Sequence, residues 1–120
     1  MNITKSPGKS VEQGVNILSL GEAYENIDEV AMDGLRGFLT EEAKTVEPPR
    51  LILDMSGVNF FGSSFIELLF VVSKRLTERK GTFAICGLST YCKEVIQITH
   101  LDHVWTIRQT RAEAIETLNG

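Results

Sequence analysis

The sequence has little of what marks several common protein classes. Among its 120 residues there are two cysteines and three prolines. Two cysteines are too few for a disulfide framework, so we expect reduced thiols and a cytoplasmic protein. No apolar run is long enough to cross a bilayer, and the polar first ten residues lack the apolar stretch of a signal peptide. We therefore expect no membrane insertion.

The chain also lacks a strong charge of either sign. It holds 12 lysines and arginines against 16 acidic residues, a net charge of −4 at pH 7. This balance excludes the electrostatic footprint of a nucleic-acid-binding protein, so no nucleic acid is expected as a partner. The 42% hydrophobic content suits one globular domain. We expect a flexible N-terminal tail over residues 1–8 and a single domain over residues 9–120.

What the chain does contain is an alternation of buried strands and amphipathic helices. Short apolar runs bounded by turn residues predict strands, and apolar residues at helical spacing predict helices. The expected strands cover residues 13–20, 50–55, 82–88 and 103–108, with room for one more at the N-terminal side. Such alternation predicts an α/β fold with a four- to five-stranded, mostly parallel central sheet and about four helices.

Local signals indicate where these helices begin and end. Asn26 is the expected N-cap of the first helix, with Glu29 in the reciprocal position. Gly81 is expected to end the second helix in a left-handed conformation. Ser89 or Thr90 can cap the third helix, and a capping box that starts at Thr110 opens the fourth. The link over residues 58–61 is expected to tuck its two rings under the sheet edge.

The second helix, expected over about residues 63–79, carries the clearest apolar stripe. The stripe recurs at helical spacing and comprises Phe65, Leu68, Leu69, Val72 and Leu76. Ile66 and Phe70 lie beside this stripe. They either widen the core face of the helix or form part of a groove for a partner helix.

Two serines open this helix. Ser64 and Glu67 satisfy the Ser-x-x-Glu capping box, which contributes on the order of 1 kcal/mol, so Ser64 is predicted to cap the helix. That assignment places Ser63 just outside the helix with a free hydroxyl. A phosphate on Ser63 would lie beside unpaired helix N–H groups, so the fold should tolerate it. A permanently unmodified docking loop is the other interpretation.

Asp54 lies at the end of an expected buried strand, where open α/β sheets place their sites. The carboxylate could bind a metal or orient a hydroxyl, but we expect it to accept hydrogen bonds from the turn at Ser56 and Gly57. His100 and His103 lack any cysteine pair with zinc spacing. The sequence also lacks a nucleophile elbow and a phosphate-binding glycine loop. We therefore expect no metal, no cofactor and no enzyme activity.

The segment Leu-Asp-Met-Ser-Gly-Val-Asn-Phe-Phe-Gly-Ser-Ser at residues 53–64 resembles the signature of the STAS family. This family takes its name from sulfate transporters and anti-sigma-factor antagonists. The order of elements over about residues 11–118 is similar as well. Two positions depart from the family pattern: Gly62 replaces the usual aspartate before the first serine, and Phe65 replaces the usual glycine after the second.

The resemblance implies an anti-sigma factor antagonist-like switch that binds a partner protein. In antagonists the first serine of the pair accepts a phosphate, which makes Ser63 the implied phosphoacceptor. The implied partner is an anti-sigma factor that is also a serine kinase of the histidine-kinase-like ATPase type. The expected partner-binding residues are Gly62, Ser63, Ser64, Phe65, Ile66 and Phe70. The alternative is a non-phosphorylated STAS scaffold or a subunit associated with a transporter.

Overall fold

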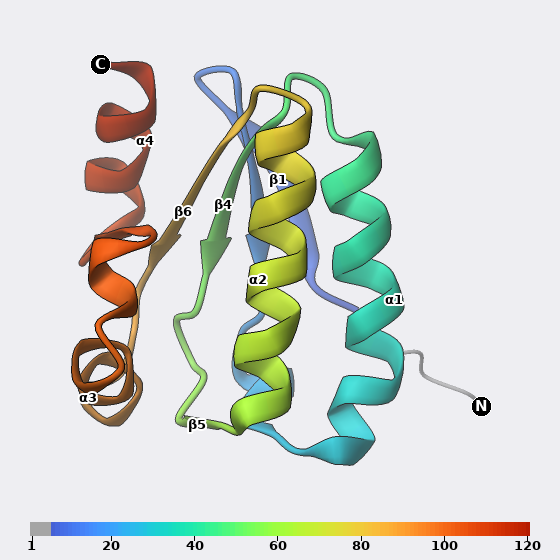
Figure 1. Cartoon of the computed structure of the whole chain (residues 1–120), viewed down its shortest axis with the longest axis vertical. Coiled ribbons are helices and arrows are strands. Elements are labelled where there is room, and N and C mark those ends of the chain that lie inside the picture. The colour runs from blue at the N-terminus through green and yellow to red at the C-terminus, as the bar shows by residue number, and fades with distance from the viewer. Residues whose placement is uncertain (1–5) are drawn as a thin grey trace.

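The computed structural model of the protein describes residues 6–120 and shows a five-stranded sheet flanked by helices (Figure 1). The strand order is β1-β2-β4-β6-β7, in which β1 is antiparallel to β2 and the other neighbours are parallel. The strands are β1 (Gly8–Glu12), β2 (Val15–Ser19), β4 (Arg50–Asp54), β6 (Thr82–Cys86) and β7 (Thr106–Arg108). The predicted α/β fold with a mostly parallel sheet is confirmed, including the additional N-terminal strand.

Helices and a small second sheet complete the fold of the described residues. The α-helices are α1 (Glu29–Thr45), α2 (Ser63–Glu78), α3 (Thr90–Ile98) and α4 (Arg111–Asn119). Short 3-10 helices form at η1 (Glu22–Tyr24) and η2 (Leu101–His103), and β3 (Asn26–Ile27) pairs in parallel with β5 (Phe60–Phe61). Both β3 and β5 follow the carboxyl end of a main strand, and β5 leads directly into α2.

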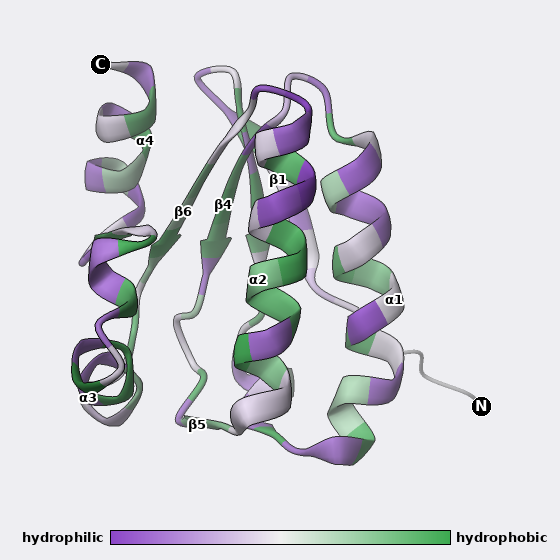
Figure 2. Cartoon of the chain, in the orientation of Figure 1, coloured by the Kyte–Doolittle hydropathy of each residue, from purple (hydrophilic) through white to green (hydrophobic). Residues whose placement is uncertain are grey.

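The helices divide the core into two layers. α1 and α2 pack side by side on one face of the sheet, and α4 lies on the other (Figure 1). Because side chains alternate along a strand, Leu51 and Leu53 of β4 join the core under α1 and α2, whereas Ile52 joins the core under α4. Figure 2 shows the hydrophobic residues concentrated in the central strands and along α2. Within residues 6–120, no helix is both long and apolar enough to cross a membrane.

The first helix begins later than the sequence predicted, so the assignment of Asn26 as its N-cap is wrong. Asn26 pairs with Phe60 in the small sheet. The N-cap is Asp28, whose carboxylate accepts a hydrogen bond from the Ala31 N–H at 2.9 Å. Asparagine and aspartate cap helices equally well, and only the strand pairing with a distant segment decides between them.

The end of the second helix also differs from the prediction. Lys80, and not Gly81, takes the left-handed conformation, with φ of 60°. Gly81 is required for a different reason, because a Cβ atom there would lie 2.0 Å from the Pro49 carbonyl oxygen. Position 81 therefore accepts only glycine, because the segment at Pro49 approaches the backbone too closely for any side chain.

Other boundaries shifted by a few residues. Gln13 and Gly14, both with positive φ, form the turn between β1 and β2, so β2 begins at Val15. Residue 103 belongs to η2, and Val104 is 58% exposed, so β7 is shorter than expected. The predicted caps at Ser89 and Thr110 are confirmed. The predicted tail over residues 1–8 falls mostly outside the described residues, and β1 already begins at its last residue.

Candidate functional site

The turn that opens α2 is held in place by a short, well-bonded loop. After β4, the Met55 N–H donates to the Cys86 carbonyl at 2.8 Å. The N–H groups of Asn59 and Phe60 both donate to the Glu25 carbonyl, at 2.8 and 3.1 Å, and fix the start of β5. Gly62 then serves as the N-cap of α2 with an extended backbone and no side-chain cap. The start of α2 is therefore positioned by backbone bonds to two other segments of the chain.

Ser63 and Ser64 are the first two residues of α2. Ser63 is exposed, but it lies in the first helical turn, whereas the sequence predicted it outside the helix. The predicted capping box of Ser64 and Glu67 is wrong, because α2 has no side-chain cap. Instead the Ser64 hydroxyl donates to Glu29 Oε1 of α1 at 3.0 Å. Ser64 therefore joins two helices, and Ser63 has the more accessible hydroxyl.

The other predicted partner-binding residues separate into core and surface. Phe65 is fully buried at 0% exposure and its ring lies 5.3 Å from that of Phe61, so its side chain belongs to the core and not to the exposed surface of the turn. Ile66 is half-buried against the core. Phe70 is 46% exposed and packs its ring 4.9 Å from Trp105. One part of the Phe70 side chain therefore contacts Trp105, and the rest is exposed to solvent.

An exposed aromatic pair lies next to the turn and was missed in the sequence. Phe60 of β5 and Tyr91 of α3 stack with ring centroids 5.8 Å apart, and they are 41% and 48% exposed. The sequence predicted both rings of residues 60 and 61 under the sheet edge. Because the two are consecutive in a strand, they point in opposite directions, and only Phe61 is buried. Strand alternation could have revealed Phe60, but nothing local indicated its contact with Tyr91.

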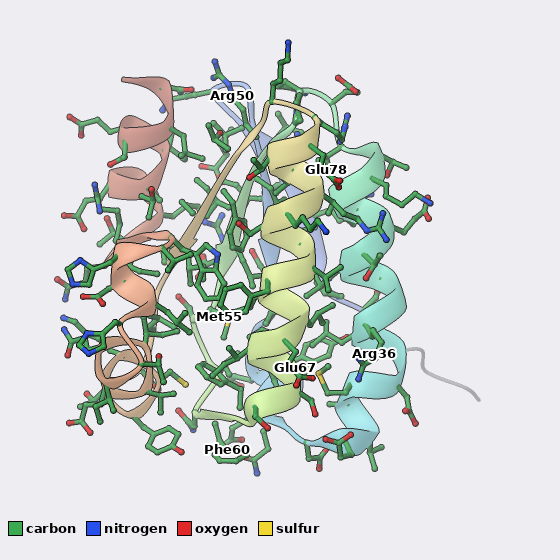
Figure 3. All side chains as sticks on the ribbon, viewed as in Figure 1. Arg36, Arg50, Met55, Phe60, Glu67 and Glu78 are labelled. Carbon is green, nitrogen blue, oxygen red and sulfur yellow. The ribbon has the colours of Figure 1, made fainter. Side chains whose placement is uncertain are left out.

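Carboxylates border the turn. Glu29 accepts the Ser64 hydroxyl, and Glu25 Oε1 accepts the Asn59 side-chain amide at 3.1 Å. Glu67 is exposed on α2 near its lower end, a short distance from Phe60 along the same end of the molecule (Figure 3). The turn therefore combines a serine hydroxyl, exposed rings and negative charge.

Asp54 belongs to a separate network under α4. Its Oδ1 accepts bonds from the Ser56 N–H at 3.0 Å and the Ser56 hydroxyl at 2.7 Å, as predicted. Its Oδ2 accepts two bonds from Arg111, at 3.1 and 2.8 Å, which the sequence did not indicate. Burial alone would raise the pKa of Asp54, but the Ser56 bonds and the Arg111 guanidinium outweigh it and lower the pKa. Arg111 also bonds Glu12 and Ser19.

This network is structural in character. Every Asp54 oxygen already has a protein partner, and Arg111 joins α4 to β1, β2 and β4. The adjacent Cys86 is buried, and burial, together with the Asp54 charge, raises its pKa to about 12, so the thiol stays protonated at neutral pH. Among residues 6–120 there is no group of three or more ligand-type side chains that could hold a metal ion.

Together, these features define a small α/β domain that exposes a serine hydroxyl and two aromatic rings at the start of α2. The chain belongs to the STAS domain family, whose family model matches residues 10–114. It is similar to an anti-sigma-factor antagonist (STAS) domain protein from Planctomyces limnophilus. The identity is 34%, the match covers 96% of this chain and 99% of that chain, and the TM-score is 0.89.

Two further solved structures have the same fold. A putative anti-sigma factor antagonist from Thermotoga maritima is 18% identical over 95% of both chains, with a TM-score of 0.84. An anti-sigma factor antagonist from Mycobacterium paratuberculosis is 24% identical over the full length of both chains, with a TM-score of 0.78. At these identities the likeness concerns the fold alone.

Proposed function

We propose that this protein is a cytoplasmic, non-enzymatic switch of the anti-sigma factor antagonist type, phosphorylated on Ser63 by a partner anti-sigma kinase. The observation that carries the proposal is the position of Ser63, exposed in the first turn of α2 within the segment that matches the family signature. The relative with 34% identity, described as an anti-sigma-factor antagonist domain protein, supports it.

The position of Ser63 explains how a phosphate could act. Phosphate adds a charge of about −1.5 to −2 and sits next to helix N–H groups that favour anions, so the fold tolerates it. A partner that covers the turn would have to bury this charge without a matched cation. An uncompensated buried charge costs several kcal/mol, enough to change a bound population into a free one.

The proposed contact surface extends from the turn along α2. It comprises Gly62, Ser63, Ser64, Ile66 and Phe70, with Phe65 supporting it from the core. The aromatic pair of Phe60 and Tyr91 extends this surface beside the turn. Partly exposed aromatic rings are typical anchors of protein interfaces.

The test is phosphorylation by a kinase of the histidine-kinase-like ATPase type from the same organism. The protein is incubated with the kinase and ATP, and the site is mapped by mass spectrometry. We expect one phosphate on Ser63, none on the Ser63→Ala variant, and an unchanged yield on Ser64→Ala. A phosphate that persists in Ser63→Ala, or none with a kinase that binds the protein, would contradict the switch.

The second candidate function is a permanently unmodified module of the same fold, either a scaffold or a subunit associated with a transporter. The carboxylate of Glu29, bonded to Ser64 beside Ser63, favours this alternative because it already occupies the positive end of α2. This alternative predicts a partner that binds Ser63→Asp as tightly as the unmodified protein. Isothermal titration of both forms against the same partner separates the two functions.

A further inference from the structure

The aromatic pair is an exposed apolar feature beside the Ser63 turn. Phe60 and Tyr91 come from β5 and α3, which pack against each other, and each ring is more than 40% exposed. Val30, in the first turn of α1, is 81% exposed. Apolar side chains that stay in solvent at one end of a small domain mark an interaction surface when polar groups surround them.

The segment that pairs with Phe60 is acidic. Residues 21–35 contain no lysine or arginine and carry five acidic side chains: Glu22, Glu25, Asp28, Glu29 and Asp33. Arg36 of α1 and Lys93 of α3 are the cations that lie nearest in the sequence to this segment and to Tyr91. This segment is tied to the turn by the hydrogen bonds from Asn59 and Ser64 to its carboxylates. Glu67 of α2 adds a further carboxylate. We call Glu22, Glu25, Asp28, Glu29 and Glu67 the acidic rim.

The opposite end of the molecule carries charges of both signs. Arg50 and Glu78 both lie at the end of the fold far from Phe60 (Figure 3). Near that end Arg79 pairs with Glu47. The excess of acidic side chains in residues 21–35 therefore makes the Ser63 end negative. A local excess of one charge orients an approaching charged partner.

We propose that the face formed by the aromatic pair, Ser63 and the acidic rim binds a protein whose matching face has an apolar centre surrounded by lysines and arginines. The inference rests on the proposed function and adds the chemistry of the partner. The rings provide the contact area that is buried, and the rim provides charge complementarity. A partner with an acidic face would meet like charges and be rejected.

The rim and Ser63 have different kinetic roles. Charges at the edge of an interface act across solvent and mainly raise the association rate, which falls as salt screens them. A group buried at the centre mainly controls the dissociation rate. Phosphate on Ser63 therefore speeds dissociation even though it adds charge of the same sign as the rim. Loss of rim charge slows association and leaves dissociation unchanged.

The first experiment measures the two rates with the anti-sigma kinase used to test the proposed function. The variant Glu22→Gln with Glu67→Gln removes two rim charges, and its matched control, Glu78→Gln with Glu116→Gln, removes two charges elsewhere. At low salt we expect roughly threefold slower association for the rim variant only. Equal association rates for both variants, or a slower rate in both, would overturn the inference.

The second experiment does not depend on that kinase. Two short amphipathic peptides of the same pattern, one of leucine and lysine and one of leucine and glutamate, are titrated into the protein and followed by amide NMR. We expect the lysine peptide alone to shift amides at Phe60, Ser63 and Tyr91, with weaker shifts in the rim variant. Shifts that are scattered, absent or equal for both peptides refute the basic partner. If these shifts appear while the kinase does not bind, only the proposed function fails.

Discussion

The contact between Asp54 and Arg111 gives the most direct test of what holds α4 to the sheet. Arg111→Ala removes both guanidinium bonds to Asp54 and the bonds to Glu12 and Ser19. Asp54 stays buried at 7% exposure with only its Ser56 bonds. The variant therefore leaves a carboxylate in a site that no longer contains its counter-charge.

The magnitude follows from how deeply each partner is buried. Loss of one partner from a fully buried pair costs roughly 3–5 kcal/mol, and exposed pairs contribute about 0.2–1 kcal/mol. Here the Asp54 side chain is 9% exposed and that of Arg111 is 36% exposed. Because the pair is partly open to solvent, water can replace part of the stabilisation that the guanidinium gives to the Asp54 carboxylate. We expect Arg111→Ala to lower the free energy of unfolding by about 2 kcal/mol at neutral pH.

The effect must also depend on pH in a defined direction. The folded-state pKa of Asp54 lies below its usual value, so the stability it contributes is present above the unfolded pKa of about 3.9 and is lost as pH falls through the folded pKa. In Arg111→Ala the burial of Asp54 is no longer compensated by the guanidinium. The difference between the two proteins should therefore be largest near neutral pH and shrink below about pH 4.

Urea unfolding at several pH values measures this difference directly. Arg108→Ala is the control, because Arg108 bonds a hydroxyl and a carbonyl but no carboxylate, and its loss should cost under about 0.5 kcal/mol. Asp54→Asn in the Arg111→Ala background should recover part of the loss by removing the buried charge. A loss equal to that of Arg108→Ala, or one that does not change with pH, would refute the reasoning.

Four other substitutions test the turn and its supports. Gly62→Asp should raise the free energy of unfolding in urea slightly, by about a few tenths of a kcal/mol, because the cap position is open and α2 lacks a side-chain cap; a clear loss would show that the neighbouring carboxylates dominate. Phe65→Ala should cost about 3–5 kcal/mol and Phe70→Ala clearly less, as measured by thermal unfolding; similar losses would contradict their difference in burial. Gly87→Ala should destabilise the fold by more than about 1 kcal/mol in the same assay, since its Cβ would lie 2.4 Å from Ser56 Oγ and its φ is positive; a neutral effect would show that this loop can shift.

Much of the fold was predictable because its signals are local. The apolar stripe of α2 and the capping box at Thr110 depend on residues within a few turns of one another, and both are present. The predictions that failed depended on partners distant in the chain. Asn26 does not cap the first helix because it pairs with Phe60 of β5. Position 81 requires glycine because the Pro49 carbonyl lies too close for a side chain.

The candidate site shows the same division. Ser63 was found from a contiguous motif, and its side chain is exposed. The contact between Arg111 and Asp54 could not be predicted, because the two residues lie 57 positions apart and no local pattern around the strand indicates it. Phe65 was expected both in the apolar stripe of the second helix and among the partner-binding residues, and its full burial fits the stripe that the helical spacing indicated.

The substitution at Gly62 is easier to understand once Glu29 is placed. The family's usual aspartate would put a carboxylate at the cap of α2, where helix N–H groups favour negative charge. Here Glu29 brings a carboxylate to the same helix end from α1, through its 3.0 Å bond with the Ser64 hydroxyl. The charge is kept, but it now depends on how α1 and α2 pack.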